Sequence, residues 1–221
     1  MASAKMSING NDYVGAFAVA TDSYALIAER IGARYEHVIE EVLRKKIARV
    51  SINGSDLIGI YVAANSHALL LPELAYRNEA DLAARQLDDV NVAVLETGLN
   101  ALRNNILAND KIAIINPMYS SSEAKIIGDN MGVEVIRMGI GGFSTVGANN
   151  ILTNKGMVMN NRVSGEEEEA LRKLVSSVSQ STANMGSLSI GLCTIANSEG
   201  IIAGSSTSGY EIANMEDGLG L

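Results

Sequence analysis

The stretch SINGNDYVG, residues 7 to 15, returns almost letter for letter as SINGSDLIG, residues 51 to 59. The second copy starts 44 residues after the first. Each copy holds an Asn-Gly pair, which favours a two-residue hairpin turn because both residues tolerate positive φ. One turn needs only one such pair, so the near-copy raises the expectation that the whole chain is periodic.

Glycines recur at this spacing along the chain. The first series is Gly10, Gly54, Gly98, Gly142 and Gly186. The second series is Gly15, Gly59, Arg103, Gly147 and Gly191, in which an arginine stands at one glycine position. A third and less regular series precedes short apolar runs at Asp22, Asn65, Asn109, Asn154 and Asn197. Three or more repeats of this length predict a solenoid or a propeller.

Each unit has the pattern strand, glycine turn, strand, loop, strand, helix. The strands are short and rich in Ile, Val and Leu, and a helix between strands suggests a crossover connection. The helical segments carry apolar stripes, as at Val38, Ile39, Val42 and Leu43. Ser164 ahead of Glu166 and Glu167 indicates a helix start, with Arg172 near the other end.

The two ends of the chain fit together. The last unit begins near Gly186 and ends in a helix-like segment over 210–215, with no strand after it. The first unit begins with a spare strand, Lys5 to Ile8, which matches Arg49 to Ile52 of the next unit. The N-terminal strand can therefore complete the last unit and close a ring without open ends. We expect an α/β fold: a five-bladed α/β propeller with pseudo-fivefold symmetry, residues 1–221 forming one domain.

Composition narrows the class of partner. The chain has 221 residues, of which 47% are apolar, and its formal net charge of −8 favours a basic protein partner over naked nucleic acid. No apolar run approaches the ~18 residues of a membrane helix, and the apolar stretch over 13–20 is interpreted as a strand. The single cysteine, Cys193, excludes an internal disulfide. We expect a cytoplasmic monomer.

Four segments resemble the archaeal form of the translation initiation factor 6 family: VAANSHALLLPE from residue 62, ILTNKG from 151, IGLCTIANSEGIIAG from 190 and EIANMEDGLGL from 211. The resemblance implies the pentein fold, which is the ring expected above. It also implies binding to the large ribosomal subunit at its intersubunit face, which blocks joining of the small subunit, and a part in large-subunit maturation. The implied main partner is a ribosomal protein beside the sarcin–ricin loop. No cofactor or metal is implied.

The resemblance also suggests binding residues. Asn65 lies in NSHALLLP, Asn149 lies in TVGAN, and Asn104 lies in ALRNN, where the family usually has Leu-Gly-Asn. Thr207 to Glu211 departs from the family's Thr-Thr-Gly-Pro-Glu. The repeat places five equivalent positions at one end of the axis: Phe17, Tyr61, Asn105, Asn149 and Cys193. We expect the ribosome-binding face to include Tyr61, Asn65, Asn104, Asn105 and Asn149, although Phe17 and Tyr61 could instead pack in the core.

An enzyme is the rival class. Penteins include guanidino-group hydrolases and amidinotransferases that use a cysteine nucleophile, and Cys193 on an inner strand could occupy that place. The only histidines are His37, on a predicted helix, and His67, in a turn-like NSH. Nothing in the sequence brings either to Cys193 with an orienting acid. Active-site loops also tend to interrupt a repeat, and this repeat is even. We therefore expect a protein without enzymatic activity.

The densest basic cluster comprises Arg44, Lys45, Lys46 and Arg49. It follows a predicted helix, where positive charge is favourable. The alternative interpretation is a minor contact to ribosomal RNA.

Overall fold

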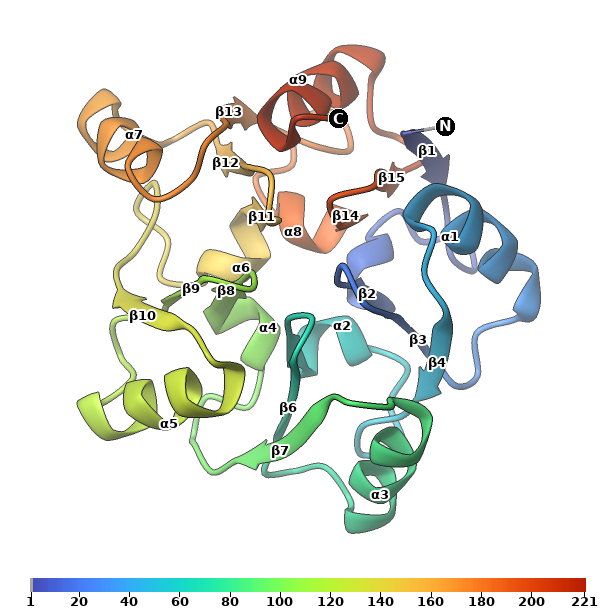
Figure 1. The fold of residues 1–221 in the computed structure, drawn as a ribbon. Helices are drawn as coiled ribbons and strands as arrows, with labels where there is room; N and C mark the ends of the chain where they lie inside the picture. Colours follow the sequence, from blue (N-terminus) through green and yellow to red (C-terminus); the bar gives the residue numbers. More distant parts are fainter. Residues whose placement is uncertain (1) are drawn as a thin grey trace.

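The computed structural model describes residues 2–221 and arranges them as five small sheets around one axis (Figure 1). Each sheet has three strands, and its middle strand pairs with an inner strand antiparallel and with an outer strand parallel. The expected five-bladed α/β propeller is confirmed.

The inner strands are short and line the axis. They are β2 (Ala18–Ala20), β5 (Ala63–Ala64), β8 (Ile106–Ala108), β11 (Ile151–Leu152) and β14 (Thr194–Ala196). The middle strands are buried at every residue, as expected for strands covered on both faces. They are β3 (Ala25–Ala28), β6 (Ala68–Pro72), β9 (Ile112–Ile115), β12 (Met157–Asn160) and β15 (Ile201–Gly204). The outer strands are β4 (Ile47–Val50), β7 (Asn91–Leu95), β10 (Glu134–Arg137), β13 (Val178–Ser181) and β1 (Ser3–Met6).

Five longer helices form the rim of the ring (Figure 1). They are α1 (Glu36–Leu43, after the short helix η2, Ala33–Tyr35), α3 (Arg77–Gln86), α5 (Ser121–Met131), α7 (Gly165–Arg172) and α9 (Gly209–Leu219). The helix start expected at Ser164 is confirmed, because the Ser164 hydroxyl accepts a hydrogen bond from the backbone N–H of Glu167. Each rim helix packs its apolar stripe inward; in α1 the buried residues are Ile39, Val42 and Leu43.

The N-terminal strand closes the ring. β1 pairs in parallel with β15, with Ser3 opposite Ile201 and Met6 opposite Gly204. The last sheet is therefore built from both ends of the chain. The expected strand bounds are wrong by two residues. Ile8 lies past the strand and forms a bridge with Asn11 across the Asn-Gly turn, as Ile52 does with Ser55 in the next unit.

A short helix follows each glycine turn, where a strand was expected. These helices are η1 (Val14–Ala16), α2 (Ile58–Tyr61), α4 (Leu102–Asn105), α6 (Val146–Asn149) and α8 (Ile190–Cys193). They surround the axis and pack against one another around the full circle (Figure 1). The interpretation of 13–20 as one strand is therefore wrong, and Cys193 ends a short helix instead of lying on an inner strand.

Close packing of these helices explains the second glycine series. A Cβ atom at Gly59 would lie 1.9 Å from the carbonyl oxygen of Gly15, and one at Gly191 would lie 2.1 Å from that of Gly147. In the four units that have a glycine at this position, the glycine packs against the backbone of the neighbouring unit. Only a residue without a side chain allows that approach.

The structure divides the third sequence series into two, each spaced by 44 residues. The first residue of the turn between inner and middle strands is Thr21, Asn65, Asn109, Thr153 and Asn197. The second is Asp22, Ser66, Asp110, Asn154 and Ser198. The irregular spacing in the sequence arose because these adjacent positions both carry polar residues.

Candidate functional site

The ring has two unlike ends. The middle strands all run from the turns just described to the loops that precede the rim helices. We call the end with those turns the polar mouth, defined by residues 21–22, 65–66, 109–110, 153–154 and 197–198. The opposite end is called the turn face, defined by the five glycine turns, the five short helices and the loops before the rim helices. A partner that docks along the axis meets one of these two surfaces.

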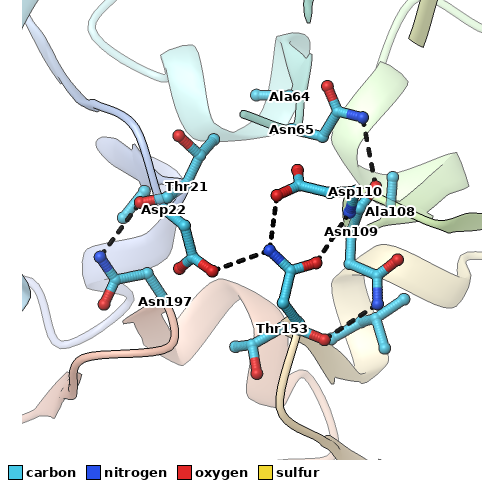
Figure 2. A pocket seen from close by; sticks show the side chains of 12 residues that line it. Thr21, Asp22, Ala64, Asn65, Ala108, Asn109, Asp110, Thr153 and Asn197 are labelled. Carbon is cyan, nitrogen blue, oxygen red and sulfur yellow. Dashed lines mark hydrogen bonds between the residues drawn. The ribbon is translucent and has the colours of Figure 1, made fainter. Parts of the chain in front are cut away.

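Hydrogen bonds between units close the polar mouth (Figure 2). The side-chain amide of Asn65 donates to the Asn109 carbonyl at 3.2 Å, and that of Asn109 donates to the Thr153 carbonyl at 3.0 Å. The Asn197 amide donates in the same way to the Thr21 carbonyl at 3.0 Å. These bonds join neighbouring units in a repeating pattern, so this asparagine series has a structural role.

Carboxylates add a second set of bonds at the polar mouth. Asp110 accepts from the backbone N–H of Ser66 at 2.8 Å, and Asp22 accepts from that of Ser198 at 2.7 Å. The Asn154 amide donates to both carboxylates, and its nitrogen lies 2.7 Å from Asp22. Within residues 2–221 no group of three His, Cys, Asp or Glu side chains could hold a metal ion. The carboxylates here accept bonds from the protein itself.

A glutamate on four of the rim helices ties each one to a glycine turn. The series is Glu79, Glu123, Glu167 and Glu211, again 44 residues apart, with Tyr35 at the corresponding place in the first unit. Each glutamate is the third helical residue and completes a capping box. Each also accepts a bond from the turn region that packs beside it. This series was not among the sequence predictions, although its regular spacing is visible in the sequence.

Glu211 shows how tightly these carboxylates are held. It accepts from the backbone N–H of Gly186 at 2.9 Å, from the Thr182 hydroxyl at 2.7 Å and from the backbone N–H of Ser208 at 2.7 Å. Burial alone raises the pKa of Glu211, but the hydrogen bonds outweigh it and lower the pKa to about 2. The carboxylate is therefore ionised at neutral pH.

The expected binding residues divide between the two ends. Tyr61, Asn104, Asn105 and Asn149 all lie on the short helices of the turn face, whereas Asn65 lies at the polar mouth. Asn65 is only 2% exposed, and its amide also donates to the Met131 carbonyl at 2.9 Å. The structure thus does not bring the five residues together into one site.

Burial distinguishes the residues of the turn face further. Asn105 is buried and bonds the Ala101 carbonyl and Asn116. Asn149 is also buried, donates to the Leu188 carbonyl and accepts from Thr145. Tyr61 and Asn104 are partly exposed, and Tyr61, like Phe17, also packs against the core. Only Tyr61 and Asn104 therefore have surface available to a partner.

Large exposed apolar side chains gather on the turn face, and the sequence analysis did not identify them. Met185 is 75% exposed in a glycine turn, and Tyr13 and Leu57 cap two of the short helices. Loops at the same end contribute Tyr76 and Met118, and the first turn of α9 contributes Tyr210. Apolar groups concentrated at one end are typical of an interaction surface.

Cys193 has no features of a nucleophile. Its side chain is fully buried, and burial raises the pKa of the thiol to about 11, so it is protonated at neutral pH. His67 is exposed in a turn at the polar mouth, at the other end of the ring from Cys193. His37 lies on α1, and its ring nitrogen is 3.8 Å from Glu41. The groups that cysteine catalysis requires are therefore not assembled around Cys193.

The basic cluster is largely engaged. Arg44 is the left-handed C-terminal residue after α1 and pairs with Glu199 at 3.5 Å. Arg49 pairs with Glu36 at 2.5 Å and donates to backbone carbonyls. Arg44 at the end of α1 fits the interpretation as helix-end charge, whereas Arg49 lies on β4.

The closed ring of five three-stranded sheets places the protein among the α/β propellers, here with exposed apolar side chains on the turn face. No helix within residues 2–221 is long and apolar enough to cross a membrane. A model of the eIF-6 family matches residues 3–218, and the chain belongs to that family. The family consists of translation initiation factors, which are not enzymes.

The chain is similar in sequence to other members of the family over almost its whole length. Translation initiation factor 6 of Pyrococcus abyssi is 37% identical over 222 residues, covering 98% of this chain and 98% of the relative. The same factor of Thermoplasma acidophilum is 38% identical over 216 residues, covering 97% and 98%. A solved structure of DDAH from Pseudomonas aeruginosa shares 15% identity at a TM-score of 0.46, covering 76% of this chain and 68% of that one.

Proposed function

We propose that this protein binds the large ribosomal subunit at its intersubunit face and sterically blocks joining of the small subunit. The main support is membership of the translation initiation factor 6 family at 37% identity over 98% of the chain. The same proposal includes a cytoplasmic monomer that acts in large-subunit maturation and in initiation.

The turn face is the proposed docking surface. It carries exposed apolar side chains, including Tyr13, Leu57 and Met185, whereas the polar mouth is occupied by amides and carboxylates bonded to one another. Burial of apolar surface drives most protein association. A ribosomal protein beside the sarcin–ricin loop is the proposed main partner, because a chain of net charge −8 favours a basic protein surface.

Within the turn face we assign direct contact to Tyr61 and Asn104. Both are partly exposed and lie on the short helices of the turn face. Asn65, Asn105 and Asn149 would act indirectly, since their side chains hold backbone carbonyls of the ring.

The proposed mechanism requires a stiff body and no chemistry. Both ends of the chain share one sheet, so no unit can separate without breaking strand pairs. We propose that residues 1–221 unfold as one domain, which a single coincident transition by two spectroscopic probes would support. A rigid ring can exclude the small subunit by occupying its place.

A minor contact to ribosomal RNA finds less support. Arg44 and Arg49 are paired with carboxylates, and only Lys45 and Lys46 of the cluster lack such a pair among residues 2–221. If these lysines touch phosphates, replacing both with alanine flattens the dependence of subunit binding on salt concentration.

Sedimentation with purified archaeal subunits tests the proposal. We expect the protein to migrate with large subunits only and to reduce the fraction of joined ribosomes. The double variant Tyr61→Ala with Asn104→Ala should bind more weakly, by about tenfold or more. A matched double variant at the polar mouth, His67→Ala with Lys155→Ala, should bind as the wild type does. Equal binding to both subunits would refute the function, and weaker binding of the polar-mouth variant alone would refute the choice of face.

A further inference from the structure

Arg103 is the one residue in the second glycine series that carries a side chain. It lies on α4, one of the short helices around the axis. At the equivalent position of the other four units, a glycine packs against the backbone of a neighbouring unit. The side chain extends into the axial space and comes within 3.5 Å of the Gly191 carbonyl, two units away. A guanidinium group therefore lies across the middle of the ring.

The space around Arg103 is a small axial cavity. It has a volume of about 40 Å³ and is lined mainly by inner strands, with Ala20, Ala64, Ala108 and Leu152 among its walls. The same four residues line a second cavity of about 30 Å³ at the polar mouth, so the two are adjoining parts of one axial space. Space of this size holds a few waters or one monatomic ion.

The protein leaves the positive charge of Arg103 without a counter-charge. No carboxylate lines the cavity around it, and Nε is buried without a hydrogen-bond partner among the described residues. The bond to Gly191 is long, yet guanidinium has five N–H donors. Burial lowers the pKa of Arg103 to about 10, so the group remains charged at neutral pH. Arg103 as a residue is half-buried, but solvent does not reach its Nε, and a buried donor without a partner is unfavourable unless something compensates it.

The inner strands add further donors. Each inner strand is the edge of its sheet, paired only with its middle strand. Edge strands present unpaired backbone N–H and C=O groups on their free side, and residues of these strands line the cavity. A ligand next to Arg103 can thus accept bonds from backbone as well as from guanidinium.

We propose that the axial cavity binds one small inorganic anion of halide size, held by the guanidinium of Arg103. Charge selects an anion, and a halide fits a cavity of about 40 Å³. Asp22 and Asp110 lie at the other end of the axial space, among the residues of the polar-mouth cavity, so the anion lies next to Arg103. The site is independent of ribosome binding and serves to stabilise the ring.

Crystals of the wild-type protein soaked in bromide give the first test. We expect an anomalous scattering peak within hydrogen-bonding distance of the Arg103 guanidinium. A cavity that contains only solvent density without anomalous signal would overturn the proposal.

Thermal unfolding gives a second test in solution. At constant ionic strength, with gluconate replacing chloride, chloride should raise the Tm of the wild type saturably, by about 3 °C at tenfold excess over Kd. The variants R103M, similar in length but uncharged, and R103G, which restores the pattern of the other four units, should show no such dependence. A wild type insensitive to the exchange, or variants as sensitive as the wild type, would refute the site.

Discussion

Replacing Glu211 with glutamine tests the ties between rim helices and glycine turns most directly. Glu211 lies in the first turn of α9, is only 5% exposed, and accepts bonds from Thr182, Met185, Gly186 and Ser208. Glutamine keeps the size of the side chain but replaces one acceptor oxygen with an NH₂ donor. Some of the N–H groups that bond to Glu211 would then face another donor.

The pKa sets the size of the expected effect. A carboxyl whose pKa falls from 4.5 to about 2 on folding contributes about 3 kcal/mol to stability at neutral pH. Because the folded pKa is the lower one, this contribution is fully present above pH 4.5 and is lost as the pH falls toward 2. We therefore expect Glu211→Gln to lower the free energy of unfolding by about 3 kcal/mol at pH 7 and by much less near pH 2.

Urea denaturation followed by circular dichroism, at a series of pH values between 2 and 7, measures both quantities. The matched control is Glu169→Gln, since Glu169 is exposed on α7 and makes no hydrogen bond or ion pair within residues 2–221. It should match the wild type within about 0.5 kcal/mol. The reasoning is refuted if Glu211→Gln is as stable as the control at pH 7, or if its stability falls with acid as steeply as that of the wild type.

Three further predictions concern the centre of the ring. Gly147→Ala places a Cβ 1.9 Å from the Arg103 carbonyl oxygen and should lower the free energy of unfolding by about 3 kcal/mol, measured by urea denaturation. The control Gly98→Ala has open space around its Cβ and should lower it by less than about 1 kcal/mol. Asn65→Ala removes two hydrogen bonds between units and should lower the free energy of unfolding by about 3 kcal/mol. Asn65→Thr introduces the residue found at the equivalent position of two other units and should lower it by less. Cys193 should react with a thiol reagent at least about a thousandfold more slowly in the native protein than in denaturant; rapid native labelling would contradict its burial.

The spacing of 44 residues was enough to predict the ring, because the same interactions must recur wherever the same backbone recurs. Glycines of the second series mark close backbone contacts, and together with the other repeating positions they predicted five equivalent units. The sequence also indicated that the first strand completes the last unit. What it left open was the conformation after each glycine turn. A run such as the one over 13–20 fits a strand by composition, and the packing of five short helices around the axis decides otherwise.

Site residues were harder to predict because an amide side chain can either bond to groups of its own protein or stay available to a partner. Asn149 and Asn104 look alike in sequence, but Asn149 is buried in hydrogen bonds to its own ring while Asn104 is partly exposed. Which use applies depends on whether a donor or carbonyl from another unit lies within reach. That distance is fixed by contacts between residues far apart in the chain.

The sequence by itself determined the number of units, the closure of the ring and the family. Periodicity is a local property, repeated, and can be found without coordinates. The tertiary structure alone decided that the apolar side chains gather at the turn face, that Cys193 is sealed from solvent, and that Arg103 reaches an axial cavity. Each of these depends on which side chains from separate units lie in contact around the axis, and the sequence does not specify those contacts.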